Sequence, residues 1–212
     1  MNPGHQSRRS AARDRPAASG GRNTRSCPRP VLALAAVLAL AAAGVGCGGE
    51  EPRSAVDREE LQAALKGSPA PLRRLHDQAN EIIDGGPGAF RRRLDGLDGY
   101  PVVVNKWASW CGPCRLEFPF FQREARKRGK RVAFLGVDSL DSREDAGDFL
   151  EKLPVPYPSF FDPKGKVAAV FRGERVFPAS AFYDSKGELV YTKQGQYDSQ
   201  ADLARDIRRY AR

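Results

Sequence analysis

Histidine and cysteine are scarce in this sequence, which limits the kinds of site it can form. The 212 residues include two histidines, His5 and His76, and four cysteines. A structural zinc site takes about four nitrogen or sulfur ligands, and a serine-type triad needs a histidine as its base. Since His5 lies in a basic leader, only His76 is left for the folded part. We therefore expect no metal site and no serine-type hydrolysis.

The sequence also lacks an apolar run long enough to span a bilayer as a helix. Its longest run, over residues 31–43, has thirteen Val, Leu and Ala residues, whereas a spanning helix needs about 20 and a signal h-region about 7–15. Arginines precede the run, and Gly44-Val45-Gly46-Cys47 follows it. Residues 1–47 are therefore predicted to be an export signal that resembles a bacterial lipoprotein signal with Cys47 acylated, although Gly44 stands where that signal usually has Leu.

An ordinary signal peptide and an uncleaved short anchor stay open as alternatives. Each of the three leaves the bulk of the chain outside the cytoplasm. We expect attachment to the outer face of the cell membrane, through lipid or through the N-terminal segment.

Positive charge is concentrated in the leader. Residues 1–30 contribute +6 of the net charge of +9. The basic run over residues 126–131 is interpreted as a helix end, because cations suit the negative end of the helix dipole and Gly129 suits the C′ position. We predict no nucleic-acid partner.

The four cysteines do not form a disulfide framework. Cys27 precedes the expected cleavage point and Cys47 would carry lipid, so Cys111 and Cys114 remain. A disulfide between cysteines this close closes almost no loop and stabilises the fold little. The value of this pair must lie in its reactivity.

Strand and helix patterns alternate along the second half of the chain. We expect a tether and helical spacer over 48–96 and one α/β domain over 97–212, with a central sheet that helices cover on both faces. Strands are predicted at 102–107, 131–138, 159–161, 179–183 and 188–193. Helices are predicted at 54–66, within 72–83, near 90–97, and at 114–128, 142–153, 166–171 and 199–210.

The segment WASWCGPC, from Trp107 to Cys114, carries the chemistry. A Cys-x-x-Cys pair can bind zinc, attach haem or act in redox, but zinc lacks ligands here, and Arg115 stands where haem attachment needs histidine. The pair follows a predicted strand and precedes a predicted helix. A thiolate at Cys111 would be stabilised by the helix N-terminus, so Cys111 is the expected nucleophile and Cys114 the resolving thiol. The first turn of the helix tolerates Pro113.

The chain resembles the TlpA/ResA/DsbE-like exported oxidoreductases of the thioredoxin superfamily over residues 97–211. The resemblance is carried by VVVNKWASWCGPCRLEFP, FLGVD, YPSFFD, VFPASAFYDSKGELV and Gly195. It implies a thioredoxin fold with an extra α/β insertion near 142–162, and no cofactor besides the Cys111–Cys114 disulfide. It also implies that Pro178, after Phe177, is cis, pairs with the substrate backbone and keeps metal off the thiols. A simple turn proline is the alternative.

Further positions follow from the same resemblance. Asn105 matches the exported subgroup, and Glu117 matches a carboxylate that could accept the proton of Cys114; a solvated helix charge is the alternative for Glu117. Trp110 is expected to flank the thiols, with simple packing as the alternative, and Lys106, where many relatives carry Phe, has no explanation from the sequence. The residues expected to contact substrate are Trp110, Gly112, Pro113 and Phe177.

The favoured activity is reduction of disulfides in exported protein substrates, with apocytochrome c as a candidate. A CcdA/DsbD-like membrane electron carrier would then re-reduce the pair. The dipeptide Gly112-Pro113 matches reducing thioredoxin, whose potential is about −270 mV against about −120 mV for the oxidant DsbA. An oxidant of exported proteins would use the same residues and stays open.

Two further classes are weaker alternatives. A thiol peroxidase would need threonine where Ala108 stands. A metal- or haem-handling chaperone would need a wider cysteine spacing and a distal histidine, and the sequence has neither.

Overall fold

The computed structural model describes residues 63–212. The predicted export signal over 1–47 with Cys47, the tether over 48–53 and most of the predicted helix 54–66 lie outside the described residues. Within 63–212, no helix is long and apolar enough to cross a membrane.

A single mixed sheet of six strands organises these residues, in the order β1-β4-β3-β2-β5-β6. The first four strands run parallel, while β5 is antiparallel to β2, and β6 to β5. Every residue of β2 and β3 is buried, as expected where both faces of a sheet are covered. The strands are β1 (Ile82–Ile83), β2 (Val102–Trp107), β3 (Ala133–Ser139), β4 (Ser159–Asp162), β5 (Ala179–Tyr183) and β6 (Leu189–Gln194).

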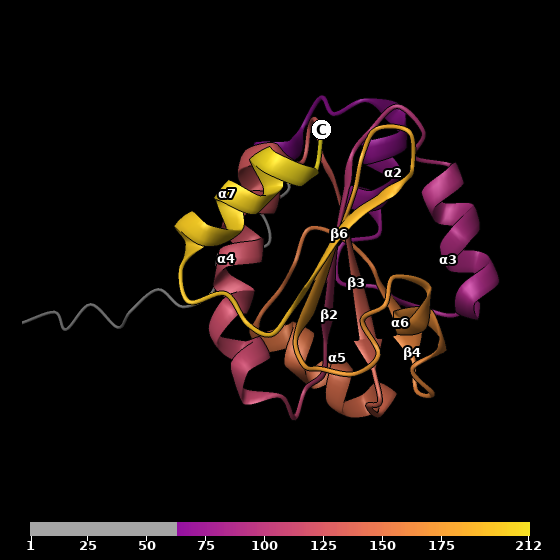
Figure 1. The fold of residues 1–212 in the computed structure, drawn as a ribbon, viewed down its shortest axis with the longest axis vertical. Coiled ribbons are helices and arrows are strands. Elements are labelled where there is room, and N and C mark those ends of the chain that lie inside the picture. The colour runs from indigo at the N-terminus through magenta and orange to yellow at the C-terminus, as the bar shows by residue number, and fades with distance from the viewer. Residues whose placement is uncertain (1–62) are drawn as a thin grey trace, which may run out of the picture. The chain divides into compact units, whose positions relative to one another are not determined.

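Helices cover both faces of the sheet and create two cores. One core packs α4, α5 and α7 against the face that carries Val103 and Trp107, and the other packs α2, α3 and α6 against the face that carries Val102 and Val104. Figure 1 shows α4 and α7 on one side of the sheet and α3 and α6 on the other. The helices are α2 (Ala70–Asp77), α3 (Gly86–Asp95), α4 (Gly112–Arg128), α5 (Arg143–Lys152), α6 (Lys166–Val170) and α7 (Gln200–Tyr210).

The predicted α/β fold is confirmed, and most predicted elements lie within two residues of the observed ones. The side chains of Ser142 and Ser199 cap α5 and α7, each accepting from the backbone N–H three residues on, as N-cap serines do. Helix α5 and strand β4 occupy the segment where the extra α/β insertion was expected.

The helix predicted within 72–83 does not extend through the whole stretch. Helix α2 ends at Asp77, and Asn80 has a positive φ of 65°. The Asn80 side chain donates to the carbonyl of Leu150 at 2.8 Å and accepts from the N–H of Val155 at 2.7 Å. These bonds turn the chain, so that the next residues pair with β4 as the edge strand β1.

Elements from the expected spacer take part in the same fold. Helices α2 and α3 pack into the second core, and β1 extends the sheet. The ring of His76 on α2 lies between two carbonyl oxygens, with Nδ1 3.1 Å from Pro156 O and Nε2 3.0 Å from Gly129 O. This contact joins α2 to the end of α4.

Gly129 ends α4, but for a different reason from the one expected. Its φ is −59°, which is not the left-handed conformation of a C′ glycine. A Cβ at this position would lie 2.6 Å from Ala125 O and 2.7 Å from Cδ2 of Leu65. Close packing therefore requires glycine here.

Candidate active site

The two cysteines lie where β2 leads into α4. Cys111 is the N-cap of α4, Cys114 lies in the first turn, and they form a disulfide. The N–H of Cys114 donates to Sγ of Cys111 at 3.1 Å. The free N–H groups and the dipole of a helix N-terminus favour negative charge, so this position suits a thiolate at Cys111.

The turn before the disulfide is held by charged neighbours. The backbone N–H of Ser109 donates to Oδ2 of Asp141, and its hydroxyl donates to Oδ1 at 2.9 Å. Arg115 donates to the carbonyl of Ser109 at 2.6 Å. Pro113 lies in the first turn of α4, where its missing N–H breaks no helical hydrogen bond.

The peptide bond between Phe177 and Pro178 is cis, as the resemblance implied. It immediately precedes β5, whose first residue, Ala179, pairs with Lys106 near the end of β2. The carbonyl of Pro178 accepts from the N–H of Gly195 at 2.9 Å. The cis-proline therefore lies beside the end of β2, where the segment that carries the disulfide begins.

Trp110 is a surface ring, 58% exposed, and not a core packing residue. Its Nε1–H donates to the carbonyl of Leu140 at 3.0 Å, and its ring centroid lies 4.8 Å from that of Phe177. This contact brings the cysteine segment and the cis-proline segment together. Two more apolar side chains are exposed next to these residues: Leu140, whose carbonyl binds Trp110, and Val176, which precedes Phe177.

Glu117 is fully buried, which excludes the alternative of a solvated helix charge. Its Oε2 accepts from the backbone N–H of Tyr197 at 2.9 Å, while its Oε1 has no hydrogen-bond partner among residues 63–212. Burial raises the pKa of Glu117 to about 8, against the opposing effects of the Tyr197 N–H and the charge of Lys193. A carboxyl group with this pKa can exchange a proton with a thiol near neutral pH.

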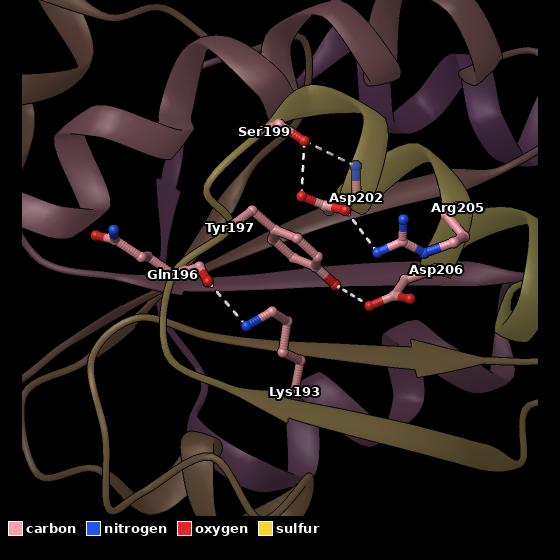
Figure 2. Close-up of polar contacts among 7 residues, drawn as sticks. All are labelled: Lys193, Gln196, Tyr197, Ser199, Asp202, Arg205 and Asp206. Atoms are coloured by element: carbon pink, nitrogen blue, oxygen red, sulfur yellow. Dashed lines mark hydrogen bonds and ion pairs between the residues drawn. The ribbon is translucent and has the colours of Figure 1, made fainter.

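The loop that presents the Tyr197 N–H is itself braced (Figure 2). The ammonium of Lys193 donates to the carbonyls of Gly195 and Gln196 at 3.2 and 2.8 Å. The hydroxyl of Tyr197 donates to Asp206 at 2.9 Å. The partner of Glu117 is thus held from both β6 and α7.

Two further ionisable groups lie near the site, and the sequence assigned a role to neither of them. Asp138 is fully buried at the end of β3, and burial followed by the nearby charge of Asp141 raises its pKa to about 8. Lys106 is also fully buried. Asp138 lies in the segment FLGVD that carries the family resemblance, but the sequence does not show that its side chain is buried. Lys106 is the one charged residue of the strand VVVNKW, and this is the signal that could have marked it.

A disulfide at a helix N-terminus, after a central strand and beside a cis-proline, defines a thiol–disulfide oxidoreductase of the thioredoxin fold. The model of the AhpC/TSA family matches residues 88–192. The chain is 33% identical over 148 residues to the thiol:disulfide interchange protein DsbE of Xylella fastidiosa (strain Temecula1), covering 68% of each chain. Against the DsbE of Escherichia coli (strain K12) it is 33% identical over 140 residues, covering 66% of this chain and 70% of that protein.

A solved structure of DsbF from MTB, in its mixed oxidized and reduced forms, is 34% identical with a TM-score of 0.50. The match covers 54% of this chain and 84% of that one. The chain therefore belongs to the DsbE family of thiol:disulfide interchange proteins, and it is an oxidoreductase acting on thiols and disulfides.

Proposed function

We propose that this protein is a membrane-attached disulfide reductase of exported proteins, in which Cys111 is the nucleophile, Cys114 the resolving thiol and Glu117 the proton acceptor. The observation that carries the proposal is the disulfide at the N-terminus of α4 with a buried carboxyl group one helical turn beyond Cys114. No cofactor besides the dithiol is part of the proposal.

The reaction transfers two electrons from the dithiol to the substrate. The thiolate of Cys111 attacks one sulfur of the substrate disulfide, forming a mixed disulfide and releasing one substrate thiolate, which takes a proton from water. Cys114 then passes its proton to the ionised form of Glu117 and attacks Sγ of Cys111, which releases the second substrate thiolate; this thiolate also takes a proton from water. A pKa of about 8 for Glu117 is close to that of a free thiol, about 8.5, so the proton transfer is nearly balanced.

Substrate would lie across the groups that surround the disulfide. The backbone beside Pro178 would pair with the substrate polypeptide, and the exposed ring of Trp110 would contact its side chains. The groups proposed to contact substrate are Trp110, Gly112, Pro113, Phe177 and Pro178.

The direction of electron flow is part of the proposal. The dipeptide Gly112-Pro113, which is the one in reducing thioredoxin, supports reduction, and the name DsbE of the relatives agrees with a role in thiol–disulfide interchange. Apocytochrome c is the proposed substrate class, and a CcdA/DsbD-like membrane carrier the proposed electron source. The apolar run over 31–43 supports export, and the small residues directly before Cys47 support acylation of Cys47 and attachment to the outer face of the membrane.

Equilibration of the dithiol against a defined thiol buffer tests the direction. We expect a midpoint near the value for thioredoxin, about −270 mV, whereas a midpoint above about −180 mV would make the protein an isomerase or oxidant. No turnover of hydrogen peroxide is expected from the reduced protein, because the buried Ala108 offers no hydroxyl at the position of the peroxidase threonine.

Trapping identifies the substrate. A Cys114→Ser protein should retain its substrate as a mixed disulfide at Cys111, since the resolving thiol is missing. The matched Cys111→Ser protein keeps, of this pair, only Cys114, which has no exposed surface, and should trap nothing through the active site. Equal recovery of partners from both variants would contradict the assignment of the nucleophile.

A further inference from the structure

Lys106 is a fully buried cation within the central strand β2. Side chains alternate across a strand, so Lys106 points to the opposite face from Asn105 and Trp107, toward the core that contains Val104. A buried charge is costly unless hydrogen bonds compensate it. The contacts of Lys106 should therefore show what it does.

The ammonium group is committed to one short segment. Nζ donates to the carbonyl of Gly173 at 2.8 Å and to that of Val176 at 3.0 Å. It also lies 3.4 Å from the centroid of the Phe177 ring. An ammonium group has three N–H donors, so two bind the carbonyls and the third is left for the face of the ring, an attractive cation–π geometry.

No carboxylate within residues 63–212 lies within salt-bridge distance of this ammonium group. Asp162 and Glu174 act on it only at longer range, and they partly offset the burial that lowers the pKa of Lys106 to about 8. The ammonium group of Lys106 therefore binds the segment 173–177 and forms no ion pair with a described residue.

This segment has little structure of its own. Residues 172–178 form no helix or strand, and Arg172 has a positive φ of 59°. The segment leads into the cis bond between Phe177 and Pro178, and the Phe177 ring contacts the exposed ring of Trp110. A line of contacts therefore runs from Lys106 through Phe177 to the surface beside the disulfide.

We propose that Lys106 is a positioning residue that holds the segment 173–177 against β2, so that Phe177 and Pro178 present a fixed surface to polypeptide substrates. This inference rests on the proposed disulfide exchange at Cys111. A polypeptide disulfide must lie along this surface to react. A small organic disulfide has to reach only Sγ of Cys111 and makes no contact along this surface, so its reaction should be independent of Lys106.

The test compares these two kinds of disulfide. The reduced Lys106→Met protein, which keeps an unbranched side chain but loses the ammonium group, is assayed with insulin and with the aromatic disulfide DTNB. We expect the KM for insulin to rise about tenfold, as the loss of hydrogen bonds from a charged group implies, with kcat and the DTNB rate within about twofold of the wild type. Lys106→Arg should restore part of the insulin KM, and Lys164→Met, at an exposed lysine, should leave both substrates unchanged.

Each outcome has a defined meaning. An unchanged insulin KM in Lys106→Met, or an equal loss of rate with both disulfides, overturns the inference. If Lys106→Met does not fold, Lys106→Gln, which loses the charge but keeps a polar side chain, is assayed in its place, and the same selective rise in KM is expected. Failure of the wild-type protein to reduce DTNB would instead contradict the proposed function and would leave the DTNB and insulin rates of all variants equally low.

Discussion

Two buried ionisable side chains, Glu117 and Lys106, lie on opposite faces of the sheet at the same end of β2. They differ in how many of their polar atoms have partners. Lys106 places its ammonium group against two carbonyls and an aromatic ring. Glu117 accepts one backbone N–H through Oε2 and leaves Oε1 without a partner among the described residues.

This difference indicates a structural role for Lys106 and a chemical role for Glu117. Burial shifts the pKa of both groups to about 8, upward for the carboxyl group and downward for the ammonium group. Only Glu117 keeps an oxygen that is free to take a proton, so its shifted pKa can serve a reaction. Lys106 uses its protons to hold a loop, and the lowered pKa is the consequence of its burial.

The largest effect is expected from Glu117→Gln. Glutamine can still accept from the Tyr197 N–H but cannot take the proton of Cys114. The attack of Cys111 should stay within about twofold, while resolution by Cys114 should slow by about a hundredfold, the lower end of general acid–base effects. Rapid-quench analysis should show the mixed disulfide accumulating. Equal slowing of the attack by Cys111 and of the resolution by Cys114 would mean that Glu117, like Lys106, has only a structural role.

The stability of the oxidised protein should depend on Glu117 in one direction. Its pKa rises from 4.5 in the unfolded chain to about 8 in the folded protein, so the native state binds more protons between these values and its stability falls as pH rises. The wild-type protein should therefore lose on the order of 5 kcal/mol of stability at most across this range, and Glu117→Gln should not show this loss. Denaturant unfolding of both proteins at several pH values measures it, since Asp138 titrates in both and cancels.

The local parts of the site could be predicted from the sequence. The strand at 102–107, the helix after it and the cysteines at their junction follow from neighbouring residues, and the cis bond before Pro178 followed from the family resemblance. The two-residue strand at Ile82–Ile83 was missed because its pairing partner in β4 lies far along the chain.

The environments of Glu117 and Lys106 could not be predicted for the same physical reason. The N–H that binds Glu117 is 80 residues away, and the carbonyls that bind Lys106 are 67 and 70 residues away. Backbone groups of this kind occur at every position and leave no mark in the sequence. Only the folded sheet brings them to the buried charge.

Lys106→Met should change the alkaline limb of the stability profile. The pKa of Lys106 falls from 10.5 to about 8 on folding, so between these values the unfolded chain binds more protons and stability rises with pH. The Met variant should lack this rise, and Lys106→Arg, which does not titrate below pH 12, should lack it as well. A rise of equal slope in all three proteins would show that the ammonium group is already solvated in the folded state.

The smallest effect is expected from Lys193→Met, on the loop that serves Glu117. Lys193 binds two carbonyls and lies 4.9 Å from the centroid of the Tyr197 ring, an arrangement similar to that of Lys106. Its charge also lowers the pKa of Glu117, against the larger effect of burial. Removing that charge should therefore raise the pKa of Glu117 further, by a fraction of a unit, as expected for one partly screened charge. Infrared titration of the carboxyl band measures this shift, and an unchanged band would mean that Lys193, like Lys106, acts only on its loop.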